Sequence, residues 1–244
     1  MKRVLVIGET CRDIFNYGVC DRLCPEAPVP IFKPYETIEN AGMATNVQRN
    51  IISLGSEANL ITNENWKSIT KTRHIDQRTN HMFIRIDKND DDYERCDLSN
   101  INFNTYDAIV ISDYNKGFIS EDDIKFISEN HDCVFMDTKK ILGPWCEKIS
   151  YIKINISEYK KTKHNITPDI EKKLIITLGS QGCKYNDVVY PVPRVDIKDT
   201  SGAGDTFVSG LVVKYIQTKN IEESIIFANQ CATSVVQKRG VGVA

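Results

Sequence analysis

The sequence has little of what marks a metal centre, a membrane protein or a nucleic-acid-binding protein. Its four histidines show no metal-ligand spacing, and its eight cysteines are scattered without a Cys-x-x-Cys pair. No apolar run approaches the ~18 residues of a membrane span, and 31 basic against 33 acidic side chains leave no charge excess that would attract nucleic acid. The chain opens on "MKRVLVIG", which reads as a strand and not as a signal-peptide core. We therefore expect a cytoplasmic protein with reduced cysteines and with no membrane or nucleic-acid partner.

Short apolar runs alternate with longer amphipathic segments along the chain. With 244 residues, of which 41% are hydrophobic, the chain can bury a sizeable core as one large domain or as a domain with a small appendage. The runs that predict buried strands are Arg3–Gly8, Asp107–Ser112, Cys133–Asp137, Tyr151–Asn155 and Lys173–Gly179. The segments that predict helices are 41–54, 120–130, 156–164, 203–217 and 221–238. This order favours an α/β fold, a sheet with helices on both faces.

Two segments depart from that alternation. Segment 13–37 is rich in proline, and segment 69–88 alternates apolar and polar residues. Such alternation is typical of a half-exposed antiparallel sheet, so we expect a small β appendage on a single domain that spans 1–244. The acidic run "DKNDDDYE", Asp87–Glu94, is interpreted as a solvated turn.

The stretch "DTSGAGDTF", Asp199–Phe207, places small residues at the start of an amphipathic helix. Backbone N–H groups are unpaired at a helix N-terminus, and residues without bulk let a phosphate approach them. An acid there suits anion binding poorly, but Asp205 has a role if it accepts a proton from a hydroxyl that attacks the phosphate. The alternative is an ordinary helix-capping aspartate after a glycine turn.

This stretch resembles the C-terminal signature of the ribokinase-like (PfkB) carbohydrate kinases, and three other segments agree in order. Ala41–Gly55 is similar to the N-terminal glycine signature of that family, and Ile176–Cys183 to its nucleotide-side turn. Asn155 and Glu158 match its Asn-x-x-Glu element. The resemblance implies a three-layer α/β/α sandwich with a small β-sheet lid, and a kinase that uses ATP and Mg²⁺.

Three further segments resemble the heptose 7-phosphate kinases of ADP-heptose synthesis. These segments are "DRLCPEAPVPIF" at 21–32, "SDYNKG" at 112–117 and "DTKK" at 137–140. The narrower resemblance implies that ATP phosphorylates the anomeric hydroxyl of a seven-carbon sugar 7-phosphate, which gives a 1,7-bisphosphate.

The resemblance also implies roles for individual residues. Asp205 would be the catalytic base, with the backbone of Gly202, Ala203 and Gly204 around the transferring phosphoryl group. The sugar would lie against Asp13, Gly42, Asn46, Arg73, Lys116 and Lys139. The nucleotide would lie against Asn155, Thr177, Gly179, Gly182 and Asn229, and Asn155 with Glu158 would orient the magnesium ion. From local sequence alone, Asn155 and Glu158 also fit a solvated helix start, and Asp13 fits a simple turn residue.

A phosphorylated substrate needs cations for its far end. The candidates are Arg22, Lys71, Arg73, Arg85, Lys116 and Lys139. Each of these is individually more often a solubilising surface charge, so the prediction depends on their convergence in the fold. Lys116 and Lys139 follow the carboxyl ends of predicted strands, where open α/β sheets bind ligands, and are the preferred pair.

Three departures from the family pattern leave the substrate open. Ala41 stands where relatives have the first glycine of a pair, only 56–70 links the first signature to the lid, and the chain ends at Ala244 where relatives continue. The chain thus looks trimmed, and a kinase for another sugar or a non-catalytic sugar- or nucleotide-binding regulator remain alternatives. A dinucleotide oxidoreductase is disfavoured because "GETCRD" after the first strand lacks the Gly-x-Gly-x-x-Gly turn.

A small sheet cannot bury both of its faces alone, so the lid raises the question of a partner. Relatives use such a sheet as an active-site lid and a dimer clasp, which implies a homodimer here. The apolar lid residues expected to take part are Ile31, Phe32, Ile75, Phe83, Ile84 and Ile86. The alternative is a monomer whose lid folds onto its own α/β body.

Overall fold

The computed structural model describes residues 1–238, 240 and 242–244 of the chain. Its larger sheet has the strand order β12-β11-β10-β9-β8-β7-β1-β4. The strands are β1 (Arg3–Gly8), β4 (Glu57–Ile61), β7 (Ala108–Asp113), β8 (Val134–Thr138), β9 (Tyr151–Asn155), β10 (Leu174–Thr177), β11 (Cys183–Tyr185) and β12 (Val188–Tyr190). The six strands from β4 to β10 run parallel, and the β11–β12 hairpin closes the sheet antiparallel at one edge.

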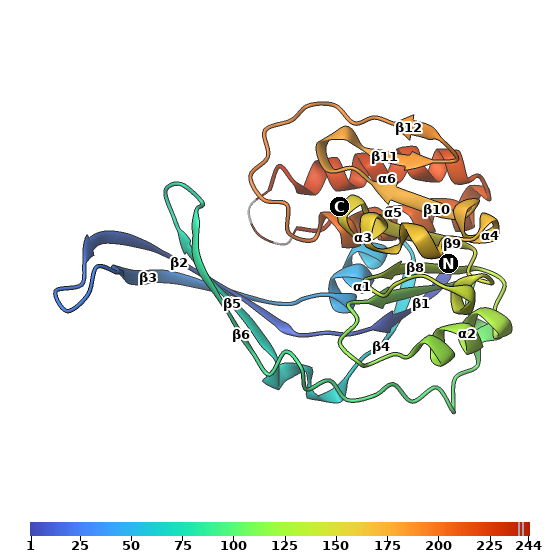
Figure 1. The fold of residues 1–244 in the computed structure, drawn as a ribbon, viewed down its shortest axis with the longest axis horizontal. Coiled ribbons are helices and arrows are strands. Elements are labelled where there is room, and N and C mark those ends of the chain that lie inside the picture. Colours follow the sequence, from blue (N-terminus) through green and yellow to red (C-terminus); the bar gives the residue numbers. More distant parts are fainter. Residues whose placement is uncertain (239, 241) are drawn as a thin grey trace.

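Helices cover both faces of this sheet, as the sequence predicts (Figure 1). The helices are α1 (Ala44–Ser53), α2 (Glu121–Asn130), α3 (Ile156–Thr162), α4 (Pro168–Glu171), α5 (Ala203–Thr218) and α6 (Ile221–Val235). Alternate residues of β1 point to opposite faces: Val4 packs in one core with α1, α5 and α6, and Leu5 packs in another with α2 and α4. The fold is therefore a three-layer α/β/α sandwich.

A second sheet projects from one end of this body as a long arm (Figure 1). Its strands are β2 (Arg12–Leu23), β3 (Pro30–Ala41), β5 (Thr70–Asp76) and β6 (Met82–Lys88), in the order β3-β2-β5-β6. These strands overlap the segments 13–37 and 69–88, where a small sheet was expected, but the expectation of a purely antiparallel sheet is wrong. The central pair, β2 with β5, is parallel, because the chain passes through α1 and β4 before it returns to the lid.

The lid has one face directed at the body and one face left open. Asp13, Phe15 and Tyr17 lie opposite Lys71, Arg73 and Ile75 in the register of β2 and β5, and residues opposite each other share a face of a sheet. Phe15, Tyr17 and Ile75 form the small buried core of this face. The apolar side chains that stay exposed on the lid include Ile38, Met82, Ile84 and Ile86. The pairing thus aligns the charged residues Asp13, Lys71 and Arg73 on the inner face.

The sequence did not predict β4, β11 or β12. These strands lie toward the edges of the sheet, and β11 and β12 have only three residues each. All eight cysteines are free. In the described part of the chain, no helix is both long enough and apolar enough to span a membrane.

Candidate active site

Asp205 lies in the first turn of α5, buried at 6% exposure. Its two carboxylate oxygens accept hydrogen bonds from the side-chain amide of Asn46 on α1 and from the hydroxyl of Tyr114 after β7, both at 2.9 Å. Burial raises the pKa of Asp205 to about 6, although these two donors oppose the rise. A carboxylate with a pKa near neutrality is suited to accept a proton in a reaction at physiological pH.

The glycine turn before Asp205 has the backbone that an anion cradle requires. Gly202 caps α5 with a φ of 79°, in the left-handed region that favours glycine. At Gly204 an added Cβ would lie 2.9 Å from the Nζ of Lys153, so a side chain would fill the space above that ammonium group. The first N–H groups of a helix have no acceptor within the helix and point outward. The turn therefore presents backbone donors and the end of a lysine to the same space.

Lys153 on β9 and Asp137 on β8 form a buried ion pair beneath this turn, with 2.6 Å between Nζ and Oδ2. Burial lowers the pKa of Lys153, but the carboxylate of Asp137 outweighs that effect and the net direction is upward. Lys153 is therefore charged at neutral pH. Neither residue was predicted as part of the site, although Asp137 belongs to the "DTKK" segment.

Two cavities meet at the glycine turn. The first, of about 570 Å³, has a mostly apolar lining that includes Phe207, Ala232 and Val236. Four residues predicted to contact the nucleotide line it, together with two residues of the turn: Thr177, Gly179, Gly182, Asn229, Ala203 and Gly204. Asn229 also donates from its side-chain amide to the carbonyl of Tyr190 at 2.9 Å, which fixes the β12 end of this wall.

The second cavity, of about 290 Å³, lies on the other side of the turn, under the lid. All six residues predicted to contact the sugar line it, together with two residues of the motif at the start of α5: Asp13, Gly42, Asn46, Arg73, Lys116, Lys139, Gly202 and Asp205. Lys71 and Arg85, two further predicted cations, also line this cavity. Arg22 does not, because it lies near the exposed end of β2, and its prediction as a phosphate ligand receives no support.

Asp13 is fixed from two sides. Its Oδ1 pairs with Nη1 of Arg73 at 2.6 Å, and its Oδ2 lies where a Cβ on Gly42 would be, only 1.9 Å away. Gly42 therefore has to be glycine for Asp13 to keep this position. Asp13 belongs to the lid strand β2, so it is not the simple turn residue of the alternative interpretation.

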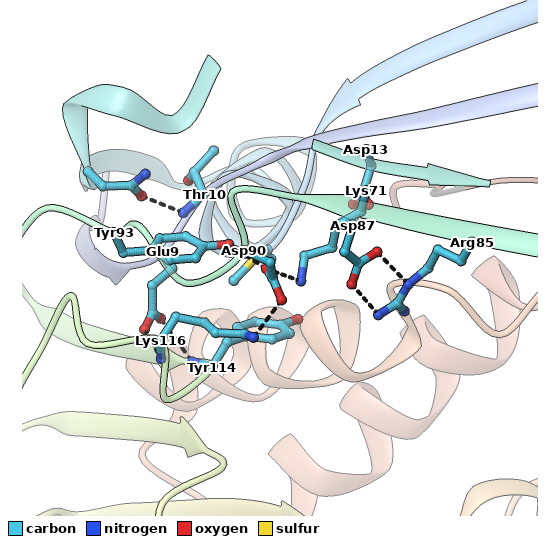
Figure 2. A network of polar contacts seen from close by, with 12 residues as sticks. Glu9, Thr10, Asp13, Lys71, Arg85, Asp87, Asp90, Tyr93, Tyr114 and Lys116 are labelled. Atoms are coloured by element: carbon cyan, nitrogen blue, oxygen red, sulfur yellow. Dashed lines mark hydrogen bonds and ion pairs between the residues drawn. The ribbon is translucent and has the colours of Figure 1, made fainter. Parts of the chain in front are cut away.

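The sequence did not predict Asp90 as part of the site. The interpretation of the acidic run Asp87–Glu94 as a solvated turn is wrong at this residue. Its carboxylate accepts from the ammonium groups of Lys71 at 2.7 Å and Lys116 at 2.5 Å, and from the hydroxyl of Tyr93 at 3.0 Å (Figure 2). The preferred cation pair was Lys116 with Lys139, but Asp90 pairs Lys116 with Lys71. Lys139 lies with its Nζ 4.1 Å from the ring centroid of Tyr114.

Asn155 and Glu158 come together at the start of α3 in a capping box. The Asn155 side chain accepts from the N–H groups of Ser157 and Glu158 at 2.8 and 2.9 Å, and Glu158 accepts from the N–H of Asn155 at 2.7 Å. This geometry is the one expected if Asn155 and Glu158 serve as the start of a helix. Neither residue lines the two cavities, so their assignment to nucleotide and magnesium remains a prediction.

Comparison with known proteins agrees with this geometry. The family described as "pfkB family carbohydrate kinase" matches residues 122–244, about half of the chain and the half that carries the glycine turn. The chain belongs to this family. Curated relatives match over the whole chain: the bifunctional protein HldE of Helicobacter pylori is 27% identical over 100% of this chain, which covers 65% of the relative's length.

Solved structures confirm the ribokinase-like fold of this pfkB family member. Ribokinase from Thermotoga maritima superposes with a TM-score of 0.70 at 17% identity, covering 99% of this chain and 95% of that one. Arabidopsis thaliana ribokinase, complexed with ribose and ATP, superposes with a TM-score of 0.73 at 16% identity, covering 98% and 94%.

Proposed function

We propose that this chain is an ATP-dependent carbohydrate kinase whose acceptor is a phosphorylated sugar, and that residues 1–244 act as one kinase unit with the lid. The observation that carries the proposal is the position of Asp205, a buried carboxylate at the junction between an apolar cavity and a cation-rich one. The preferred acceptor is the anomeric hydroxyl of a heptose 7-phosphate, with the 1,7-bisphosphate as product. The motifs in segments 21–32, 112–117 and 137–140 and the match to HldE over the whole chain support that choice.

The residues fit an adenine nucleotide on one side of the turn. The 570 Å³ cavity is mostly apolar, which suits a purine ring, and it ends at Gly204, where the absent side chain leaves room for phosphate above Lys153. ATP would supply the transferred phosphoryl group. The N–H groups at the start of α5 and the ammonium of Lys153 are the donors that would stabilise its oxygens.

In this mechanism the carboxylate of Asp205 accepts the proton of the attacking sugar hydroxyl. Asn46 and Tyr114 orient the carboxylate, and their donated hydrogen bonds favour its ionised form. Asp13, fixed by Arg73, is the acceptor for a second sugar hydroxyl on the lid side. The two carboxylates thus act differently on the substrate, because Asp205 moves a proton while Asp13 orients the ring.

Magnesium is proposed on the oxygen chemistry of Asn155 and Glu158. Carboxylate and amide oxygens are ligands that this ion accepts, and it keeps several waters when it binds. Glu158 also acts electrostatically on Lys153, so its carboxylate lies near the space where the phosphates are proposed to bind. Dependence on magnesium follows from the kinase assignment, because the ion neutralises phosphate charge during transfer.

The exposed apolar face of the lid supports the proposal of a homodimer. Ile84 and Ile86 are about half exposed, at 54% and 50%, and among the described residues the buried apolar core of the lid consists of Phe15, Tyr17 and Ile75. The sheet that carries Ile84 and Ile86 projects from the body (Figure 1), and in the described part of the chain these two side chains remain exposed. Pairing the lids of two copies would cover this apolar face. We also propose that the enzyme acts in the cytoplasm, where ATP and sugar phosphates are available.

The decisive experiment is a coupled ADP-release assay with a panel of sugars. The panel contains heptose 7-phosphates, hexose and pentose phosphates, and the unphosphorylated form of each. We expect the highest kcat/KM with a heptose 7-phosphate and a large loss when its phosphate is removed. A higher kcat/KM on a neutral sugar would contradict the substrate proposal, and no ADP release with any sugar would support a non-catalytic binder.

A further inference from the structure

Asp90 occupies the middle of a group of cations in the cavity under the lid (Figure 2). Its two lysine partners come from different parts of the fold, Lys71 from β5 of the lid and Lys116 from the loop after β7 of the body. A single carboxylate therefore links the lid to the body. Its side chain is 15% exposed, and with Tyr93 it has three donors within 3.0 Å.

The other charged groups of the cavity are matched differently. Arg73 pairs with Asp13, Arg85 pairs with Asp87 through two hydrogen bonds of 2.8 and 2.7 Å, and the ammonium of Lys139 lies against the ring of Tyr114. Lys71 and Lys116 are thus two ammonium groups that share one carboxylate, which leaves this trio with a net charge of +1. One carboxylate leaves part of the charge of the two ammonium groups unmatched, whereas a phosphate monoester, with nearly two negative charges, would match both.

We propose that Lys71 and Lys116 form the subsite for the phosphate of the substrate, and that Asp90 is an internal anion which the phosphate displaces. This proposal rests on the proposed function, since it names the group of the sugar phosphate that the cavity recognises. A carboxylate with one negative charge and a phosphate with nearly two compete for the same donors. The exchange therefore favours phosphorylated sugars over neutral ones, which leave Asp90 in place.

Co-binding of both anions is unfavourable because Asp90 is ionised. Burial raises the pKa of Asp90, but the hydrogen bonds from Lys116 and Lys71 lower it further, and the net direction is downward. Two anions a few ångströms apart in a partly buried site repel each other strongly. Asp90 sits in a short turn after β6, next to Asn89, whose φ of 56° is in the left-handed region. We expect a local change in this turn to withdraw the Asp90 side chain when phosphate binds.

The test compares Asp90→Asn with Asp91→Asn, which removes the same charge from the adjacent, exposed position. Binding of inorganic phosphate is measured by calorimetric titration, with a non-hydrolysable ATP analogue saturating the glycine turn. We expect the Kd for phosphate to fall about tenfold or more in Asp90→Asn, because its two lysines lose their competing anion. In Asp91→Asn we expect a change of less than about twofold.

Adding Lys71→Gln to Asp90→Asn should abolish the gain, which locates the phosphate at this pair. An unchanged or weaker phosphate affinity in a folded Asp90→Asn protein would overturn the proposal and make Asp90 a structural clamp. If that variant does not fold, Asp90→Ser, which keeps an acceptor for the Tyr93 hydroxyl, is titrated in its place and judged by the same outcomes.

A kinetic arm separates this proposal from the proposed function. In Asp90→Asn the KM for a sugar phosphate should fall while the KM for ATP stays unchanged, since the nucleotide cavity does not contain Asp90. If the wild-type protein phosphorylates no sugar, the kinase proposal fails, but the phosphate titration still decides the role of Asp90.

Discussion

Replacing Asp205 by asparagine should affect turnover and stability in opposite directions. Asparagine has the shape of aspartate, its oxygen can accept from Asn46, and its NH₂ can donate to the Tyr114 hydroxyl, which is able to accept. The variant should therefore fold and bind nucleotide. It has no carboxylate to accept a proton, so kcat should fall by about 10²–10⁴-fold.

The stability effect follows from the raised pKa of Asp205. Below the ordinary value of 3.8 the group is protonated in both folded and unfolded chains, and its burial has no electrostatic cost. As the pH rises through the folded pKa of about 6, the folded protein has to bury a charge, and it loses stability. The difference between the two pKa values corresponds to about 3 kcal/mol. Asp205→Asn lacks this loss.

The assay is urea unfolding of both proteins from pH 4 to pH 8, with Asp91→Asn as an exposed control. The free energy of unfolding of Asp205→Asn should exceed that of the wild type by up to about 3 kcal/mol above pH 7, and this excess should vanish near pH 4. A pH-independent difference would refute the attribution to a buried charge. A kcat close to wild type would refute the assignment of Asp205 as the base.

Other predictions concern the metal, the tyrosine and the lid. Glu158→Gln should raise the magnesium concentration for half-maximal rate, and a magnesium curve identical to that of a Ser157→Ala control would remove Glu158 from the site. Tyr114→Phe keeps the ring beside Lys139 but removes a donor to Asp205, so the pKa seen in the kcat–pH profile should rise; an unchanged profile would show that the hydroxyl does not act on the base. Light scattering at micromolar concentration should give twice the mass of the 27.7 kDa chain, and an active monomer would contradict the dimer.

The central strands were predictable because their apolar runs are buried on both faces. In β1, Val4 to Ile7 are almost completely buried, which is the pattern of an inner parallel strand. The strands that were missed have weaker signals: Val188 and Val189 of β12 are exposed, and β4 has no fully buried residue. The alternation of apolar and polar residues in the lid segments predicted strands, but it did not predict which strands pair. The parallel pairing of β2 with β5 depends on the path of the chain between them.

Some residues of the candidate site could be predicted from local sequence, and others could not. The glycine turn and Asp205 lie within one local motif, so their proposed roles follow from the local sequence. Tyr114 reaches Asp205 from the loop after β7, and the ion pair of Lys153 with Asp137 joins β9 to β8. Asp90 stands in a run of acids that has the composition of a solvated turn. Its burial is decided by two lysines distant in sequence, which no local pattern contains.

Glu9 supports two residues that line the cavity under the lid, Tyr114 and Lys116. Glu9 itself follows β1 and is fully buried, and its carboxylate accepts from the backbone N–H groups of Tyr114 and Lys116, both at 2.9 Å. Burial raises the pKa of Glu9, and the nearby carboxylate of Asp113 adds to the rise. The ionised form of Glu9 is therefore disfavoured at the position where it binds these two N–H groups. The side chain of Tyr114 contacts Asp205, and that of Lys116 contacts Asp90. Glu9 thus holds the backbone that carries both Tyr114, a donor to the proposed base, and Lys116, a member of the proposed phosphate subsite.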